Sequence, residues 1–356
     1  MADRRAGGPL TRRERIAALV AERGSVRVAD LAAELGAAAV TVRRDVEALA
    51  DAGRLTRRHG VVSVVRPVLP PVATVVAVSA FTGAYQGEIL AGAREAVTAF
   101  GGRYVLEVAR DLVATRAAVE RAARSPEVSG ILYAPQWGTP EEAAADSAAG
   151  FWPEGLPVVL LDRFAPRGSP LARREAVRSD HATGVHRALS HLRALGHRRV
   201  LAFCRDDSPT ARTVRGCFPE ALRSLGLPVL AEPVLSSDHV DAERRLRAPD
   251  PAEVVRRHGA TAVFVHSDTD ALSLVPRLTG AGLRVPEDVS VVAYDDVVAS
   301  VGEVPLTAVA PPKREVGRAA VELVAWRSVN PSAPWRHLEI GPRLVDRGSC
   351  RPVGTG

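Results

Sequence analysis

The chain has 356 residues, of which 46% are hydrophobic and 25% charged, and its formal net charge is +6. That length exceeds one ordinary domain, and the composition is typical of a globular protein. No apolar run approaches the roughly 18 residues that cross a bilayer, and the N-terminal segment lacks the apolar core of a signal peptide. The three cysteines show neither disulfide nor metal-ligand spacing. We therefore expect a cytoplasmic protein of two or three domains with no bound metal or cofactor.

The positive charge is concentrated at the start of the chain. Residues 1–70 hold 13 arginines and 8 acids, whereas the rest of the chain holds 34 basic and 33 acidic groups. Such asymmetry indicates a polyanion-binding module attached to a nearly neutral body.

Three helices and a hairpin are predicted within residues 1–66. Apolar spacing predicts a first helix over 11–23, a second that ends at Gly36, and a third over about 39–52. The following residues alternate weakly around a glycine, as a two-stranded hairpin would. This order predicts a winged helix-turn-helix domain.

The third predicted helix carries an apolar face and outward cations. Val42, Val46 and Leu49 share one face, Arg44 points away from it, and Arg43 flanks Arg44. This arrangement is typical of a recognition helix in the DNA major groove, with wing cations on phosphates. The candidate DNA contacts are Thr41, Arg43, Arg44, Arg57, Arg58 and His59. The alternative is a solvated arginine face on a small helical bundle.

The same segment resembles the DeoR-type winged helix-turn-helix of bacterial transcriptional regulators. The resemblance covers about Thr11 to Val65 and rests on "RRERIAALV", "VRVADLAAELG" and "TVRRDVEALADAGRLTRRHG". The family usually has serine near the start of the recognition helix, where this chain has Ala38. Loss of a helix N-cap costs about 1 kcal/mol and removes a possible phosphate contact.

A proline-rich segment, residues 67–73, is predicted to be a stiff and extended linker. Beyond it, short apolar strands alternate with helical segments, which predicts an α/β fold with parallel sheets covered on both faces. The expected helices include 86–100, 181–195, 241–258 and 268–281. In such folds ligands bind beyond the carboxyl ends of the strands.

Acids, arginines and aromatic residues follow the predicted strands. Such groups suit a polar, polyhydroxylated ligand. Asp180 is expected to cap a helix, whereas Asp268 is either a cap or a ligand contact. Trp137 is predicted to face the ligand and stack on a sugar ring, with an exposed loop tryptophan as the alternative.

The body is similar to the effector-sensing domain of LacI/GalR regulators, which shares the periplasmic-binding-protein fold. The collinear matches include "VVLLDR", "VRSDHATGVHRALSHLRALGHRRVLAF", "AVFVHSDTDAL" and "GLRVPEDVSVVAYDD". The resemblance implies dimers, and two doubly wound lobes joined by three crossovers, with the effector between them. The implied lobes of the 74–356 domain are 74–176 with 306–330, and 177–305 with 331–356. The implied effector contacts are Tyr85, Asp162, Arg163, Arg212, Ser267 and Asp295.

The chain departs from that family at several positions. "GAYQ" replaces an Asn-Pro-aromatic-aromatic loop, Ser267 stands where asparagine is usual, and Cys217 replaces a glycine. The family's own helix-turn-helix and hinge helix are absent. We therefore predict a DeoR-type DNA reader joined to a LacI-type sensor, a regulator and expected repressor that binds operator DNA as a dimer or tetramer.

Two other functions are the alternatives. An enzyme is disfavoured, because the histidines between 181 and 197 form no metal-binding face and no phosphate loop or nucleophile motif is present. Asp295 and Asp296 could hold a metal, but adjacent strand residues point to opposite sides. A sugar-binding protein without regulatory DNA binding, for transport or in the cytoplasm, is the second alternative.

Overall fold

The computed structural model divides the chain into two compact units, Met1–Leu69 and Pro70–Gly356, here called the N-terminal and C-terminal units. The division falls inside the predicted linker. The structure describes residues 12–51, 55–58, 60–64, 70–80, 83–135, 137–205, 208–230, 234–235 and 250–354.

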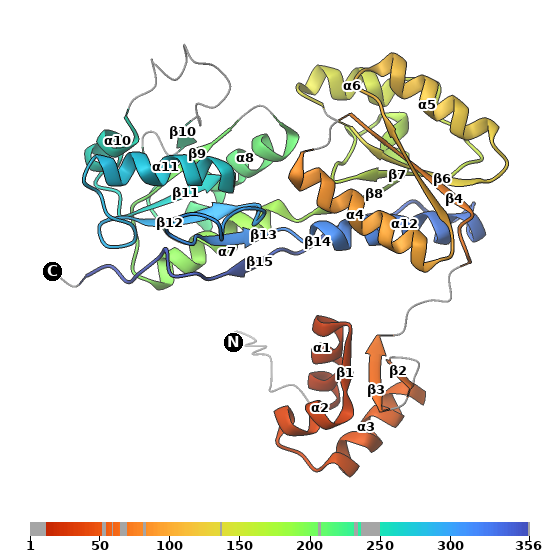
Figure 1. Cartoon of the computed structure of the whole chain (residues 1–356), viewed down its shortest axis with the longest axis horizontal. Coiled ribbons are helices and arrows are strands. Elements are labelled where there is room, and N and C mark those ends of the chain that lie inside the picture. Colours follow the sequence, from red (N-terminus) through yellow and green to blue (C-terminus); the bar gives the residue numbers. More distant parts are fainter. Residues whose placement is uncertain are drawn as a thin grey trace, which may run out of the picture. The chain divides into compact units, whose positions relative to one another are not determined.

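The N-terminal unit has the predicted three helices and a small antiparallel sheet (Figure 1). Its elements are α1 (Arg12–Arg23), β1 (Ser25–Arg27), α2 (Val28–Leu35), α3 (Ala39–Asp51), β2 (Leu55–Arg58) and β3 (Val61–Val64). The strand order is β1-β3-β2. Strands β2 and β3 form the hairpin, and β3 also pairs with β1, the short strand before α2. Ile16, Leu31, Val46 and Val62 join these elements in one apolar core.

The C-terminal unit contains two lobes, each built on a six-stranded sheet (Figure 1). The first-lobe sheet is parallel, in the order β14 (His337–Ile340), β8 (Glu175–Ser179), β7 (Val158–Leu161), β6 (Val128–Ala134), β4 (Thr74–Ser79) and β5 (Arg103–Val108). The second-lobe sheet has the order β10 (Val234–Leu235), β9 (Val200–Cys204), β11 (Ala262–His266), β12 (Ser290–Tyr294), β13 (Thr307–Ala310) and β15 (Arg343–Val345), the last pairing antiparallel.

Helices cover both faces of each sheet. In the first lobe, α4 (Ala84–Ala99) and α12 (Lys313–Val329) cover one face (Figure 1). The other face is covered by α5 (Leu112–Arg124), α6 (Pro140–Ala148) and the short η1 (Pro170–Arg173). The second lobe has α7 (His181–Ala194), α8 (Pro209–Ser224), α10 (Pro251–His258) and α11 (Asp268–Gly280). Alternate residues of β9 enter two separate cores: Val200 lies with α7 and α8, and Leu201 with α10 and α11.

The chain crosses between the lobes three times: after β8, after β13 and after β14. The three predicted crossovers are therefore present, but the predicted lobe boundaries are wrong. β13 pairs with β12 and belongs to the second lobe rather than the first. β14 pairs with β8 and belongs to the first lobe rather than the second, as does all of β8. Of the helix predicted over 241–258, residues 241–249 lie outside the described part.

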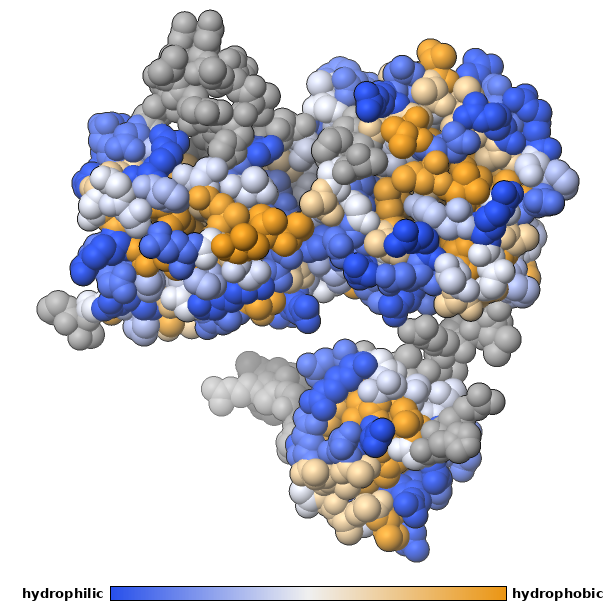
Figure 2. Space-filling view, viewed as in Figure 1, coloured by the Kyte–Doolittle hydropathy of each residue, from blue (hydrophilic) through white to orange (hydrophobic). Residues whose placement is uncertain are grey.

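The edge strand β5 exposes apolar side chains. Leu106 and Val108 are 42% and 52% exposed, and Val113 of the neighbouring helix α5 is 79% exposed. Figure 2 shows extensive apolar surface on the first lobe. Among the described residues, none of the helices combines the length and apolar character needed to cross a membrane.

Helices α4 and α12 approach each other so closely that glycine is required on both. A Cβ atom at Gly92 would lie 2.1 Å from the Arg314 carbonyl oxygen, and one at Gly317 would lie 2.0 Å from the Ile89 carbonyl oxygen. Because these neighbours are backbone atoms, a side chain would force the helices apart.

Gly92→Ala should therefore lower the unfolding free energy of the C-terminal unit by about 1–3 kcal/mol, the usual cost of overpacking. Gly87→Ala is the matched control in the same helix, because its Cβ would meet no atom within 4 Å. That variant should be neutral or stabilising by up to about 1 kcal/mol, since alanine favours helix. Scanning calorimetry of both variants measures the difference, and equal transition temperatures would contradict the close approach.

Candidate nucleic-acid interface and ligand pocket

The outer face of α3 presents two unpaired arginines. Val42 and Val46 are buried, whereas Arg43 and Arg44 are exposed and make no hydrogen bond or ion pair with any described residue. Thr41 is half-buried, and its N–H donates to the Ala38 carbonyl oxygen over 2.8 Å. The two guanidinium groups are thus available to a ligand outside the domain.

The neighbouring acid, Asp45, turns inward. Its carboxylate accepts hydrogen bonds from Arg12 Nε at 2.5 Å and Arg13 Nε at 2.9 Å. Burial opposes ionisation, but these two bonds hold the pKa of Asp45 below its ordinary value. This pair ties α1 to α3 and explains why the only acid in "TVRRDV" leaves the arginines unneutralised. The sequence could have indicated that Asp45 is buried, because its spacing from Val42 and Leu49 places all three residues on the same face of the helix.

The wing differs from the prediction. The Arg57 guanidinium donates to Glu47 Oε1 of α3 over 2.6 Å, so this cation is partly neutralised within the domain. His59 and the side chain of Arg58 lie outside the described residues.

A cavity of about 390 Å³ lies between the two lobes of the C-terminal unit. It brings together four groups predicted as effector contacts and one predicted as either contact or cap: Tyr85 and Arg163 from the first lobe, and Ser267, Asp268 and Asp295 from the second. It also includes Arg205, Thr210 and His266, which were not predicted as contacts. Each of these lies at or soon after the carboxyl end of β9 or β11, the position from which ligand-binding residues project in such sheets.

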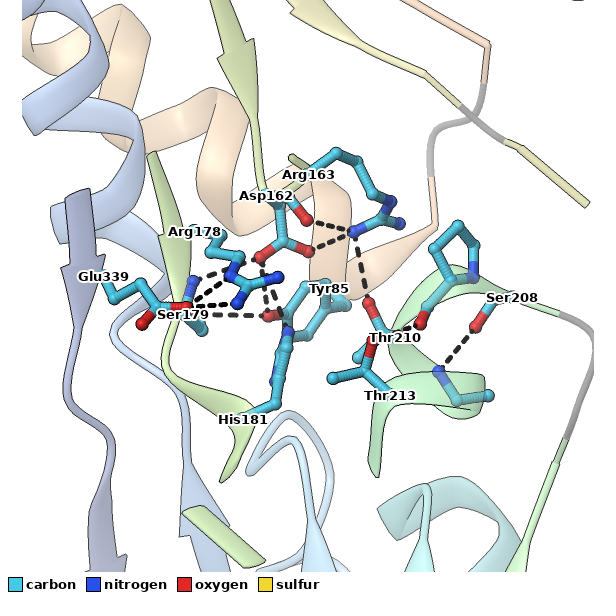
Figure 3. Close-up of polar contacts among 12 residues, drawn as sticks. Tyr85, Asp162, Arg163, Arg178, Ser179, His181, Ser208, Thr210, Thr213 and Glu339 are labelled. Atoms are coloured by element: carbon cyan, nitrogen blue, oxygen red, sulfur yellow. Dashed lines mark hydrogen bonds and ion pairs between the residues drawn. The ribbon is translucent and has the colours of Figure 1, made fainter. Parts of the chain in front are cut away.

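A buried polar network lies behind Tyr85 and Arg163, which line the pocket from the first lobe. Figure 3 shows Tyr85, Asp162, Ser179 and His181 converging, with Arg163 reaching toward Thr210. The Tyr85 hydroxyl lies 3.5 Å from Asp162 Oδ1 and 3.4 Å from Ser179 Oγ. Asp162 has a left-handed backbone, with φ of 57°, and its side chain is fully buried. It therefore does not line the pocket as predicted but orients Tyr85 and Arg163 from beneath.

Arg163 connects the lobes. Its Nη1 donates to Asp162 Oδ2 over 2.6 Å and to Thr210 Oγ1 of α8 over 3.2 Å. Its Nε is buried and has no hydrogen-bond partner among the described residues. A ligand acceptor in the pocket could satisfy that donor.

Asp268 has a structural role that neither predicted alternative described. It lines the pocket, but its Oδ2 accepts hydrogen bonds from the Val297 and Val298 N–H groups at 2.5 and 2.7 Å. The cap of α11 is Ser267, whose capping-box partner is Asp270. Asp180 does cap α7 as predicted, accepting from the Thr183 N–H over 2.9 Å.

Asp295 faces the pocket from a strained backbone. It follows β12 with φ of 98°, and Asp296 follows with φ of 51°, so the two are not strand neighbours as assumed. Asp296 pairs with Arg347 over 2.6 Å, whereas Asp295 Oδ1 is buried without a partner among the described residues. Burial and the nearby Asp268 carboxylate raise the pKa of Asp295 to about 7, against the opposing charge of Lys313.

His266 lines the same pocket as Asp295. It is 5% exposed, and neither ring nitrogen has a hydrogen-bond partner among the described residues. Burial lowers its pKa to about 4, so the imidazole is neutral at physiological pH. The pocket thus offers unsatisfied hydrogen-bonding atoms on Asp295, Arg163 and a neutral imidazole.

These pKa values predict opposite trends in stability with pH. The raised pKa of Asp295 means that its contribution is present below about pH 4 and lost as pH rises through 7. The lowered pKa of His266 means that its contribution is present above about pH 6.5 and lost as pH falls toward 4. Asp295→Asn should therefore melt progressively higher than the wild type as pH rises from 5 to 8. Thermal melts across that range test this, and a pH-independent difference would contradict it.

Two further predicted contacts, besides Asp162, do not line the interlobe pocket. The Arg212 guanidinium, from α8, donates to the carbonyl oxygens of Trp137 at 2.8 Å and Gly138 at 2.5 Å, and so fastens the second lobe to the first. The Trp137 ring is 5% exposed, and its Nε1 donates to Asp146 Oδ2 over 2.6 Å. The indole is therefore neither in the interlobe pocket nor an exposed loop residue, because its N–H finds a buried partner inside the first lobe.

The N-terminal unit has the fold of a winged helix-turn-helix domain. The C-terminal unit has two lobes joined by three crossovers, as in periplasmic binding proteins. Residues 12–68 match the DeoR-like helix-turn-helix domain, and residues 189–350 match the periplasmic binding protein-like domain. The chain thus combines a DeoR-like helix-turn-helix domain with a periplasmic binding protein-like domain, and both predicted resemblances are confirmed.

Curated relatives match a little over half of the chain. The HTH-type transcriptional repressor PurR of Photobacterium profundum is 29% identical over 201 residues, covering 56% of this chain and 58% of that protein. The HTH-type transcriptional repressor CytR of Escherichia coli (strain K12) is 28% identical over 210 residues, covering 55% and 57%. The chain therefore spans less than two thirds of the length of these relatives.

Solved structures share the fold. The transcriptional regulator CelR–cellobiose complex has a TM-score of 0.62 and 24% identity, covering 89% of this chain and 98% of that one. The lac repressor dimer bound to operator and the anti-inducer ONPF has a TM-score of 0.63 and 23% identity, covering 79% and 94%. The predicted two-domain α/β architecture is confirmed.

Proposed function

We propose that this protein is a cytoplasmic transcriptional regulator, a repressor whose binding to double-stranded operator DNA is controlled by a sugar or sugar derivative in the interlobe pocket. The observation that carries the proposal is the pairing of two features in one chain. One is the recognition helix with Arg43 and Arg44 unpaired among the described residues. The other is a polar pocket lined by both lobes of a sensor domain.

An uncharged polyhydroxylated ligand fits the pocket best. Two charged groups are already engaged by neighbours: Arg205 donates to Asp270 at 2.6 and 2.7 Å, and Asp268 accepts hydrogen bonds from two backbone N–H groups. The unsatisfied atoms belong to Asp295, His266 and Arg163. Hydroxyl groups can donate to the first two and accept from the third. The Tyr85 ring at the same wall provides a face for a sugar ring.

Binding to DNA as a homodimer is part of the proposal. Two helix-turn-helix modules match two operator half-sites, and dimer symmetry sets their spacing. The apolar residues Leu106 and Val108 on the edge strand β5 support association, because such edges are normally covered. Sedimentation with and without DNA would distinguish a dimer from a tetramer.

The proposal is tested in two steps. Selection from random duplexes with the full chain should enrich one sequence, and deletion of residues 1–66 should abolish that binding. A thermal-shift screen against sugars, sugar phosphates and nucleosides should then identify the ligand, since a ligand at 100 times its Kd stabilises by about 2.7 kcal/mol. Ligand binding without selective DNA binding would instead support a sugar-binding protein with no regulatory role.

A further inference from the structure

The first lobe contains a second cavity, of about 450 Å³, beyond the carboxyl ends of β4, β5 and β6 and beside α5 and α6. It shares no lining residue with the interlobe pocket among the described residues. Its volume is within the range of small-molecule sites. This cavity is therefore a separate candidate site.

The inner wall is an aromatic pair held by one buried carboxylate. The Tyr133 hydroxyl and Trp137 Nε1 both donate to Asp146 Oδ2, the latter over 2.6 Å. Asp146 is 7% exposed, and its other oxygen, Oδ1, is buried with no hydrogen-bond partner among the described residues. Because an unsatisfied buried acceptor is costly, this oxygen would gain from a ligand that brings a donor.

The rim of the cavity carries one cation, Arg110, and two carboxylates that are held by backbone N–H groups. Arg110 is exposed and makes no hydrogen bond or ion pair with any described residue. The two rim acids are engaged in helix caps: Asp111 accepts from the Ala114 N–H over 2.7 Å, and Glu142 accepts from the N–H of the cap residue Thr139 over 3.3 Å and from the Gly138 N–H over 2.6 Å. Leu112, which is 42% exposed, adds an apolar lip.

We propose that the first lobe holds a second small-molecule site that takes small aromatic acids bearing a hydroxyl or amino donor. The donor hydrogen-bonds to Asp146 Oδ1, the ring packs against the aromatic wall formed by Tyr133 and Trp137, and the carboxylate pairs with Arg110 at the rim. Aromatic packing supplies the apolar contact, and the guanidinium–carboxylate pair supplies a charge-assisted hydrogen bond.

The test is calorimetric titration of the full chain with 4-hydroxybenzoate, benzoate and phenol. 4-Hydroxybenzoate should bind one per chain and about tenfold more tightly than either partial probe, because each lacks one of the two polar contacts. Arg110→Gln should weaken 4-hydroxybenzoate binding about tenfold and leave phenol binding unchanged. Arg110 is exposed, so this substitution does not threaten folding.

Arg116→Gln is the matched control. Arg116 is an exposed arginine on the adjoining helix α5 that pairs with Glu120 and does not line the cavity. Its substitution should leave all three affinities unchanged. Absence of saturable 4-hydroxybenzoate binding would overturn the proposal. Binding that survives Arg110→Gln at full strength, or that Asp295→Asn abolishes, would also overturn it by locating the ligand elsewhere.

Discussion

Arg44→Ala should weaken binding to the selected DNA sequence by roughly 1–3 kcal/mol while leaving binding to unrelated duplexes nearly unchanged, because a bidentate arginine–guanine contact carries that much discrimination. The structure favours this position because Arg44 is exposed on α3, away from the buried Val42 and Val46. Competition binding against a scrambled duplex at two salt concentrations measures the effect. Unchanged sequence preference in Arg44→Ala would show that another surface reads the DNA.

Arg57→Ala is the informative comparison. Its cation is shared with Glu47 over 2.6 Å, so its loss should be small and equal for all sequences, as for a phosphate contact. The Glu47→Ala variant frees Arg57 and should strengthen non-specific binding. A sequence-dependent effect of Arg57→Ala would indicate that the wing contacts base edges rather than phosphates.

Asp295→Ala and Arg212→Ala should both retain DNA binding yet lose most of the response to the sugar ligand, for different reasons. Asp295 lines the pocket, so its loss should raise the Kd of the sugar at least about tenfold. Arg212 lies outside the pocket and holds the Trp137 and Gly138 carbonyl oxygens across the lobes. Its loss should reduce the free-energy difference between the two lobe arrangements. A ligand can change DNA binding only by shifting the equilibrium between such arrangements.

The measurement is DNA affinity with and without saturating sugar, together with the Kd of the sugar, for each variant. Arg223→Ala is the matched control, an exposed residue near the end of the same helix as Arg212. It should respond like the wild type. A normal response in both Asp295→Ala and Arg212→Ala would remove the interlobe pocket from the mechanism.

Local pattern was sufficient to predict most of the elements. The buried Val42, Val46 and Leu49 identify α3, and Gly36, with φ of 60°, ends α2 as its sequence position suggested. The lobe boundaries could not be predicted in this way. β13 and β14 are short strands whose lobe is decided by strand pairing: β13 pairs with the preceding strand β12, and β14 pairs with β8, which is distant in sequence.

The sequence could predict that the pocket lies at the strand ends, but not which of the residues there line it. Tyr85, Arg163, Ser267 and Asp295 were predicted and do line it, whereas Asp162 lies beneath. Trp137 was placed wrongly because sequence does not reveal the partner of an indole N–H. That partner, Asp146, comes from α6, a helix that pattern alone did not connect to it.

The central claim is that one chain couples DNA binding to a ligand between its lobes. Such coupling is reciprocal, so a sugar that changes DNA affinity by some factor must have its own affinity changed by the same factor when DNA is bound. The decisive measurement is therefore the Kd of the selected DNA at saturating sugar, together with the Kd of the sugar at saturating DNA. We predict equal factors of at least about fivefold. A sugar that binds the interlobe pocket while both constants stay unchanged would contradict the account.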